Sequence, residues 1–336
     1  MTTLISHEAG SLRPRLEFAA KAFIVTSFVG VLVAGAARIG QRAFASREHR
    51  IDLSRWTVLE RPAWSTLDDV SAIRAQSGLS SYYAGLFDTP ALATVDGRLA
   101  RSPSVRRVVG VSRVYPNRLE AVMELRRPVV AVAVRVPGKA DLYVETDDEG
   151  VALTKPLAAR PVRDGHALRV VIGATGALPA PGKPFGADVV AAASLADSLD
   201  SYSDDKGRAL LALLDRIDVS NYGGRPRPGT SEIQLSASPP APAGKPAPGA
   251  APTVPPLSTK CVVEWGRAGD RDADGGEMPF DAKASRLLQA LRLFPGLAGL
   301  KTVKVAFNDL VVVPDGSSTP HHLKRALEID GGVQSK

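Results

Sequence analysis

The sequence is poor in cysteine, the residue on which disulfide-stabilised folds and cysteine enzymes depend. Cys261 is the one cysteine among 336 residues, which excludes an internal disulfide and leaves secretion neither supported nor opposed by cysteine usage. It stands directly before an apolar run, so we expect a buried core thiol. No phosphate-binding loop and no nucleophile–base set is visible in the sequence, and nothing in it calls for a cofactor.

Aromatic residues are also scarce, at 5% of the chain, and this bears on the arginine-rich stretch 101–132. Over 119–125 the odd positions are apolar, while Glu120 and Glu124 stand at even ones. This period of two predicts a strand with one solvated face. The arginines interleave with these glutamates and no aromatic ladder accompanies them, which favours a solvated strand face over a nucleic-acid interface. We expect no nucleic-acid partner.

The chain has a single long apolar run, the twenty residues 18–37, whose one charge is Lys21. A helix needs roughly 20 residues to cross a bilayer, and Lys21 lies near one end, where its side chain can reach the interface. A cleaved signal peptide is the alternative, because small residues follow the run, but its apolar core is usually only about 7–15 residues long. We favour an uncleaved anchor at 18–37 after a short tail at 1–17. Basic residues flank both ends, so orientation stays open.

The rest of the composition is ordinary, with 44% hydrophobic residues, 23% charged residues and a formal net charge of +7. The length predicts about two to three domains. Residues 51–136 are predicted to form a small unit of strand, helix, helix, strand and strand. Its first helix follows a cap at Ser65 or Thr66, and its second begins with Thr89 as the cap.

A larger β-rich domain with flanking helices is predicted at 137–314, which makes the fold class α+β. Within it we expect helices at 187–199, 208–217 and 281–294. The Pro/Ala-rich insertion at 236–258 cannot contribute to a core. The tail at 315–336 is polar, and we expect it to be disordered.

Four aspartates match the spacing of a calcium loop, D-x-D-x-D-G-x5-[DE]: Asp270, Asp272, Asp274 and Asp281. In such a loop, alternate carboxylates and a glycine turn converge on a hard cation. Against this interpretation, no predicted helix precedes the first aspartate, and Glu277 occupies a position that is usually apolar. We expect no metal here, and the spacing stays a weak hypothesis beside that of a flexible acidic loop.

The segment Leu310–Pro314 reads LVVVP and is the final strand in sequence order. A last strand is often a sheet edge, and its unpaired backbone groups invite another chain to add a strand. We therefore predict that a protein partner binds Asp309, Leu310, Val311, Val312 and Val313. The alternative is a core strand whose alternate side chains pack on the helix that ends at Phe294.

The order of these parts resembles that of the bacterial cell-division family FtsQ, also called DivIB. Three stretches between Leu53 and Pro314 carry the likeness. One is DDEG at 147–150, similar to the family's Asp-x-x-Gly hairpin, and another is VEWGR at 263–267, followed by a helix ending in LFP and paired terminal strands. The remaining stretch matches the family's spacing of prolines and arginines at Pro103/Val105, Arg113/Pro116 and Arg126/Pro128.

The resemblance implies a polypeptide-transport-associated (POTRA) domain at 51–136 and the family's β domain at 137–314. It implies a non-enzymatic, single-pass scaffold of the inner (plasma) membrane, with the bulk of the chain outside the cytoplasm at the division septum. The expected partners are FtsB/FtsL-like divisome proteins, and the expected role is to help regulate septal peptidoglycan synthesis. An FtsB-like partner is expected to add a strand at Leu310–Pro314.

Two other classes of protein stay open. One is an anchored or secreted POTRA-type binding module of a secretion or envelope-assembly system. The other is an anchored cell-wall hydrolase, which needs a catalytic histidine or cysteine in a folded region. His166 is the one histidine that fits that requirement.

Overall fold

An apolar helix, a small three-stranded sheet and a nine-stranded sheet follow one another along the chain in the computed structural model. The chain divides into two units, each described by itself below. The first unit takes in Met1–Arg61, Val70–Ala100 and Arg107–Glu124, and the second takes in Pro62–Asp69, Arg101–Arg106 and Leu125–Lys336. The residues described are 9–45, 50–52, 56–79, 83–85, 89–114, 118–135, 137–138, 140–163, 165–224, 230–237, 261–267, 278–307 and 309–323.

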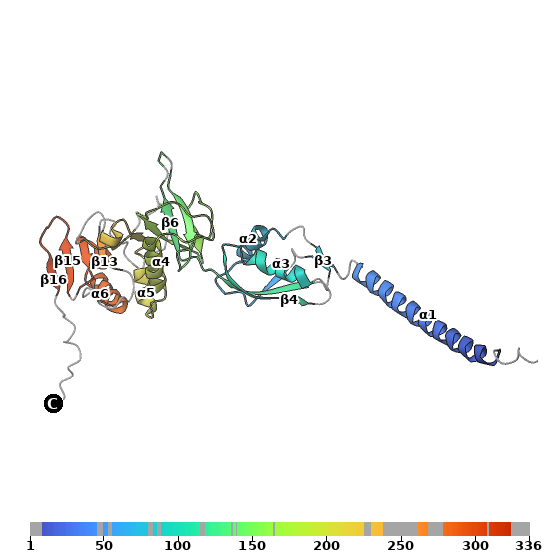
Figure 1. The fold of residues 1–336 in the computed structure, drawn as a ribbon. Coiled ribbons are helices and arrows are strands. Elements are labelled where there is room, and N and C mark those ends of the chain that lie inside the picture. Colours follow the sequence, from blue (N-terminus) through green and yellow to red (C-terminus); the bar gives the residue numbers. More distant parts are fainter. Residues whose placement is uncertain are drawn as a thin grey trace, which may run out of the picture. The chain divides into compact units, whose positions relative to one another are not determined.

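The N-terminal helix α1, Ala9–Ala45, contains the predicted apolar run (Figure 1). Its segment Leu16–Gln41 has a mean hydropathy of 2.0 and is not buried against any other described part of the chain. By length and composition this helix can cross a membrane, although a signal sequence would meet the same criteria. The prediction of one N-terminal apolar helix is confirmed.

The next elements run in the order β1, β2, α2, β3, α3, β4 and β5, so the predicted strand, helix, helix, strand and strand are present together with two further short strands, β1 and β3. The parallel pair of β2 and β5 places β5 in the middle of a sheet with the order β2-β5-β4. A two-stranded antiparallel sheet, β1-β3, accompanies them. The bounds are β1 Arg50–Asp52, β2 Trp56–Leu59, α2 Leu67–Ser77, β3 Tyr83–Gly85, α3 Thr89–Leu99, β4 Val105–Val114 and β5 Arg118–Leu125.

Helix α2 begins where the sequence places its cap. The Thr66 backbone nitrogen and hydroxyl donate to Asp69 Oδ2 at 2.8 and 2.9 Å, and the Asp69 nitrogen donates to Thr66 Oγ1 at 3.2 Å. This reciprocal pair satisfies N–H groups that the first turn of a helix leaves without partners. After the last helical residue, Gly78 adopts a φ of 63°, a conformation that commonly ends helices.

Strand β5 has the predicted alternation, with Leu119, Ala121 and Met123 buried. On the solvated side, Arg107 of β4 donates to Glu124 of β5 at 2.5 Å, and both side chains are largely exposed. The charges of this stretch therefore lie on a wet strand face, as the sequence predicted.

The second unit is built on a nine-stranded sheet with the order β16-β15-β14-β13-β12-β11-β10-β6-β7. The pairs β6–β10, β10–β11 and β13–β14 are parallel, and the others are antiparallel. A separate hairpin joins β8, Val162–Arg163, to β9, His166–Ala167. The sheet strands are β6 Val130–Val134, β7 Leu142–Thr146, β10 Arg169–Ile172, β11 Arg216–Asp218, β12 Ile233–Ser236, β13 Val262–Gly266, β14 Leu300–Lys304, β15 Leu310–Pro314 and β16 His321–Leu323.

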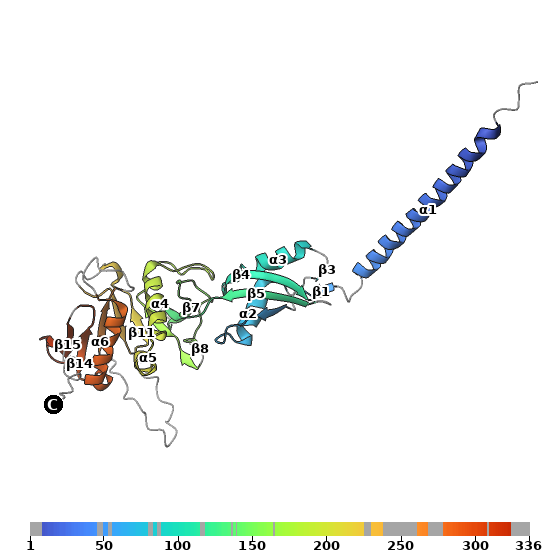
Figure 2. The ribbon, with the colours of Figure 1, turned by 90° about the horizontal axis from the view of Figure 1, so that it is seen from below.

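Three helices lie side by side along one face of this sheet (Figure 2). They are α4, Ala187–Asp200, α5, Asp205–Leu211, and α6, Phe280–Leu293. One core of buried side chains joins helices and strands, including Leu199 and Leu287 from the helices and Val263 and Val303 from the strands. The helices at 187–199 and 281–294 are thereby confirmed within one or two residues.

Two boundaries differ from the sequence prediction. The helix expected at 208–217 begins earlier, because Asp204 accepts hydrogen bonds from the nitrogens of Lys206 and Gly207, and it ends at Leu211. Residues 216–218 form β11 instead, held between β10 and β12. Strand β6 lies within the nine-stranded sheet, so the domain boundary expected at 136 is too late in the chain.

The Pro/Ala-rich insertion at 236–258 falls almost entirely outside the described residues. Its first residue, Ser236, ends β12, and Ala237 packs partly against the core. Because β12 and β13 are antiparallel neighbours, the insertion connects two adjacent strands of the sheet.

We expect Gly173→Ala to destabilise the second unit more than Gly165→Ala. Both glycines have similar positive φ, 75° and 78°, but a Cβ at Gly173 would lie 2.6 Å from the Ser220 nitrogen, whereas one at Gly165 meets nothing within 4 Å. The left-handed strain costs about 1–2 kcal/mol in either variant. The backbone clash should add about 1–3 kcal/mol in Gly173→Ala alone. Thermal unfolding of both full-length variants in detergent tests this, and equal melting temperatures would contradict it.

Candidate functional site: a terminal strand pair and an arginine–carboxylate cluster

The predicted partner-binding residues form strand β15 and the residue before it. Leu310 and Val312 are each 2% exposed and belong to the core, while Val311, Val313 and Pro314 are half-buried. The alternation expected of a strand with one core face is therefore present. Asp309 directly precedes this strand and is exposed.

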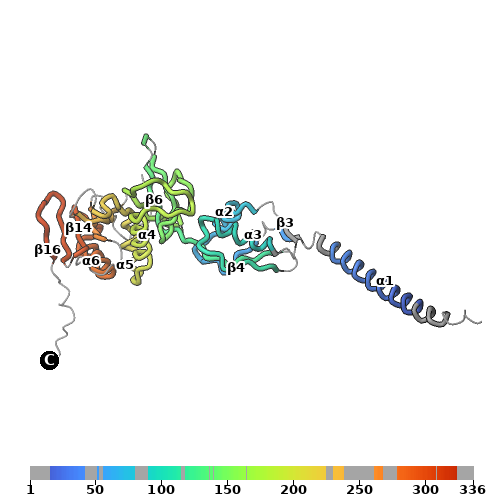
Figure 3. The backbone as a smooth tube through the Cα atoms, in the orientation of Figure 1, coloured from blue at the N-terminus to red at the C-terminus, as the bar shows by residue number. Residues whose placement is uncertain are grey.

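The expectation that β15 is the edge of its sheet is wrong. β14 pairs with one side of β15, and β16 pairs with the other, with Leu310 opposite Leu323 and Val312 opposite His321. The chain turns after β15 at Gly316, whose φ is 77°, and the Ser317 nitrogen donates a hydrogen bond to the Pro314 oxygen at 3.2 Å. Figure 3 shows the backbone turning back to form β16. The expected disorder of the tail is therefore wrong for residues 315–323. Residues 324–336 lie outside the described part.

Strand β16 gives little sequence signal, because two of its three residues are histidines. His321 and His322 are exposed, and Leu323 alone packs partly against the core. His322 Nδ1 lies 3.4 Å from Asp309 Oδ2, an ion pair when the imidazole is protonated. A local hydrophobic pattern could not reveal this strand, since its place depends on backbone pairing with β15.

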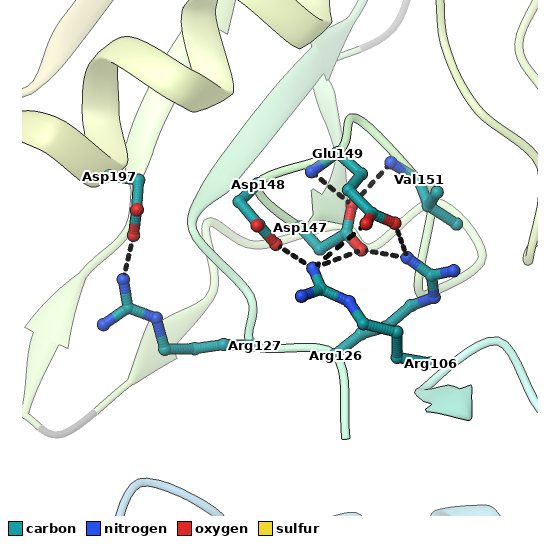
Figure 4. A network of polar contacts seen from close by, with 8 residues as sticks. All are labelled: Arg106, Arg126, Arg127, Asp147, Asp148, Glu149, Val151 and Asp197. Carbon is teal, nitrogen blue, oxygen red and sulfur yellow. Dashed lines mark hydrogen bonds and ion pairs between the residues drawn. The ribbon is translucent and has the colours of Figure 1, made fainter. Parts of the chain in front are cut away.

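A cluster of charged residues forms the second notable feature of the second unit (Figure 4). We call Arg106, Arg126, Asp147, Asp148 and Glu149 the arginine–carboxylate cluster. Arg106 belongs to β4, Arg126 follows β5, and the three acids follow β7 in a turn that ends at Gly150.

Asp147 is the centre of this cluster, and its side chain has no exposed surface. Oδ1 accepts hydrogen bonds from the nitrogens of Val151, at 2.7 Å, and Glu149, at 3.1 Å. Oδ2 accepts from Arg126 Nη1 at 2.5 Å, and Arg106 Nη2 lies 3.9 Å away. A buried carboxylate is tolerated when donors and a cation compensate its lost hydration, and Asp147 has both.

The same two arginines hold the neighbouring acids of the turn. Arg126 Nη1 also donates to Glu149 Oε2 at 2.6 Å, and Arg106 forms an ion pair with Asp148. Arg126 and Asp147 come from two of the three stretches that carry the family resemblance, so the structure brings these motifs into direct contact. Arg106 was not singled out from the sequence, because nothing local marks its partner 42 residues away.

The charges around the cluster lower the pKa of the Glu149 carboxyl. The hydrogen bond from Arg126 lowers the pKa of the Glu149 carboxyl, burial opposes this, and the charges of Arg106 and Arg126 lower the pKa further. All three carboxylates of the turn are thus paired with arginine, an arrangement suited to holding a turn in place.

The predicted core thiol is confirmed. Cys261 is 1% exposed and belongs to the core of the nine-stranded sheet. Burial raises the pKa of its thiol to about 12, so the reactive thiolate form is suppressed at neutral pH.

Most of the weak calcium candidate falls outside the described residues. Asp270, Asp272 and Asp274 are not among them, and Asp281 lies in the first turn of α6. Within the described residues, no group of three His, Cys, Asp or Glu side chains could hold a metal ion. The calcium hypothesis stays untested.

A hollow of about 630 Å³ in the second unit contains His166 in its lining. Around it, Arg160 donates to Asp215 at 2.5 Å, and Arg169 forms an ion pair with Asp200. The described residues that line this hollow include no serine, threonine or cysteine, and its carboxylates are those of Asp200, Asp205 and Asp215. The hydrolase alternative stays untested.

A second hollow, of about 430 Å³, lies at the carboxyl ends of β6 and β10, a common place for ligands in parallel sheets. The adjacent N-terminus of α4 is already occupied by Asp188, which is 2% exposed. Asp188 accepts from the Thr175 nitrogen and hydroxyl at 2.7 and 2.8 Å, and from the Val189 nitrogen at 2.9 Å. Because the chain's own carboxylate takes these donors, this helix end does not offer an anion site.

Comparison with protein-family models finds none that matches the chain, and comparison with curated proteins finds no match either. The family resemblance therefore stays a prediction from motifs and their order.

We expect Asp147→Asn to unfold the second unit at lower denaturant or temperature than Asp148→Asn. The first change leaves Arg126 without its buried counter-charge and places an amide among N–H donors, a loss of about 3 kcal/mol. Asp148 has a side chain 38% exposed, and its surface pair with Arg106 contributes at most about 1 kcal/mol. Equal unfolding midpoints for the two full-length variants would show that Asp147 is not the centre of the cluster.

Lowering the pH should remove the contribution that Glu149 makes to the stability of the fold. A carboxyl whose pKa is lowered by folding stabilises the fold fully above its unfolded-state pKa, and this contribution is lost as pH falls through the folded-state value. The ordinary value is 4.5, so the loss should begin below that pH. Between pH 7 and about pH 3.5, the melting temperature of Glu149→Gln should fall less than that of the unchanged protein. Because the side chain is half exposed, a difference of about 1–3 °C is expected; identical falls would refute the assignment.

Proposed function

We propose that this protein is a single-pass, non-enzymatic scaffold of the bacterial division machinery, of the FtsQ/DivIB kind. In this proposal α1 anchors the chain in the inner membrane, and the two units lie outside the cytoplasm at the septum. The scaffold binds FtsB/FtsL-like proteins and through them helps regulate septal peptidoglycan synthesis.

The observation that carries the proposal is the order of parts along the chain. An apolar helix comes first, then a unit with the order β1, β2, α2, β3, α3, β4 and β5, in which β2, α2, α3, β4 and β5 correspond to the βααββ of the resemblance, and then a larger sheet ending in β15 and β16. The resemblance predicts an anchor, a POTRA domain and a β domain in this order. The βααββ arrangement supports the POTRA assignment for the first unit.

The arginine–carboxylate cluster adds independent support. The resemblance rests on separate short motifs, and the ion pair from Arg126 to Asp147 connects two of them in space. Motifs that make one contact are expected to be retained together, because either residue alone would leave a buried charge without its partner.

The exposed arginines of the first unit fit a place close to a membrane. Arg107 of β4 is largely exposed and paired only with the similarly exposed Glu124 in the described contacts. An anionic bilayer surface attracts basic protein surfaces that lie close to it. No nucleic acid is needed to explain the arginine content of this stretch.

A fluorescent fusion to the C-terminus of the full-length chain tests the proposal in the bacterium that encodes it. We expect a ring at mid-cell in dividing cells, and filamentous cells when the protein is depleted. A matched fusion lacking residues 1–45 should lose the ring, because it lacks α1. An even signal around the envelope together with normal division on depletion would contradict the division role and favour the secretion or envelope-assembly module.

A further inference from the structure

The link between α1 and the sheet of the first unit is short. Four residues separate the end of α1 at Ala45 from the start of β1 at Arg50, and three separate β1 from Trp56, the first residue of β2. The five steps from Ala45 to Arg50 span at most about 18 Å, even when the chain is fully extended. The start of β1 is therefore held within this distance of the end of α1.

The length of α1 places that end at a bilayer surface. Its apolar segment Leu16–Gln41 has 26 residues, which at 1.5 Å per residue make a helix of about 39 Å. A bilayer is about 30 Å thick in its hydrocarbon core and about 40–45 Å thick with its head groups. When α1 crosses the membrane, Ala45 therefore lies at the head groups, and β1 begins close to them.

The register of the three-stranded sheet shows which of its ends follows the membrane. β2 and β5 are parallel, with Trp56 opposite Leu119, so both strands begin at the same end. β4 stops there as well, because three residues connect Val114 to Arg118, the first residue of β5. We call this the proximal end of the sheet. The distal end, where β5 reaches Leu125, lies about 23 Å farther along the strand.

The arginines near the two ends differ in their partners. Near the distal end, Arg107 forms an ion pair with Glu124, while Arg106 and Arg126 belong to the arginine–carboxylate cluster. At the proximal end, Arg118 is exposed, and no hydrogen bond or ion pair of its side chain is among the described contacts. Arg118 therefore keeps its positive charge available to a group outside the chain.

The sequence around the proximal end is basic. Residues 46–55, between α1 and β2, include three arginines and two acids. Arg113 and Arg118 add two positive charges from the sheet, against one negative charge from Glu120. Each basic side chain at an anionic bilayer strengthens attraction about fivefold. The attraction is screened beyond about 8 Å at physiological ionic strength, so it acts on the end that touches the head groups.

We propose that the proximal end of the three-stranded sheet binds the anionic lipid head groups of the membrane that α1 crosses, with Arg118 paired to lipid phosphate. The partner is a bilayer surface, because the short link holds this end beside the head groups at a high effective concentration. The guanidinium of arginine suits phosphate, to which it donates two parallel hydrogen bonds. The proposal rests on the proposed function only in that α1 crosses a membrane.

The test uses the full chain in lipid nanodiscs, with one dye attached to an introduced cysteine. Cys261 is 1% exposed, so the introduced cysteine is the one that reacts with the dye. Ser112→Cys places the dye on an exposed position of β4 near the proximal end, and Glu124→Cys places it on an exposed position near the distal end. Lipids with a nitroxide on the head group quench a dye that lies close to them.

In nanodiscs that contain phosphatidylglycerol, which is anionic, we expect the dye at position 112 to be quenched at least twofold more than the dye at position 124. Glu124→Cys also removes the partner of Arg107, which favours lipid contact at the control position and makes the comparison stringent. In nanodiscs of zwitterionic phosphatidylcholine alone, quenching at position 112 should fall at least twofold.

Two variants test the role of Arg118 itself. In anionic nanodiscs, Arg118→Gln should lower quenching at position 112 toward the zwitterionic value, because it removes the charge from an exposed position. Arg118→Lys is the matched control and should retain most of the quenching, because it keeps the charge. Raising the salt concentration to about 1 M, where the screening length is about 3 Å, should act like Arg118→Gln.

Quenching at position 112 that is equal in anionic and zwitterionic nanodiscs, or that Arg118→Gln leaves unchanged, would overturn the proposal. Quenching that appears only in nanodiscs holding two chains would also overturn it, by assigning the proximal end to a second copy. A chain that does not enter nanodiscs would contradict the anchor of the proposed function together with the lipid contact. An inserted chain without charge-dependent quenching would contradict the lipid contact alone.

Discussion

A carboxylate with no exposed surface constrains how the second unit is built. Asp147 loses its hydration on folding, and it regains partners from the nitrogens of Glu149 and Val151 and from the guanidinium of Arg126. These donors fix the turn after β7 against the residues that lead into β6. Because an uncompensated buried charge costs several kcal/mol, the turn, the start of β6 and Arg126 must be in place together.

The nine-stranded sheet has β7 at one end of its strand order and β16 at the other, and the chain protects the two ends in different ways. At one end, β7 gains backbone hydrogen bonds between Tyr143 and Leu157 at 2.9 and 2.7 Å, so an irregular segment protects part of that strand. At the other end, β16 lies over β15 through three residues. Open sheets need such protection because unpaired strand edges join one another.

Several reactive side chains of the second unit are held by ion pairs or buried in its core. The carboxylates of the turn are held by arginines, the thiol of Cys261 is buried, and His166 lies in a hollow whose lining has no serine, threonine or cysteine.

The sequence by itself determined the elements whose signals are local. The apolar run within α1, the alternation of β5, the cap of α2 and the helix α6 each depend on residues close together in the chain, so period and capping chemistry predicted them. The same reasoning predicted a strand at Leu310–Pro314 and left open that alternate residues pack on the core, and the structure shows that these are Leu310 and Val312.

Only the tertiary structure decided which strands are neighbours. It placed β6 in the larger sheet, replaced the end of an expected helix by β11, joined Arg126 to Asp147, and laid β16 over the strand expected to be the edge. None of these has a local signature, because backbone pairing is indifferent to side-chain type and an ion pair can join residues far apart in sequence. A strand of histidines beside an apolar strand becomes visible only when the sheet is assembled.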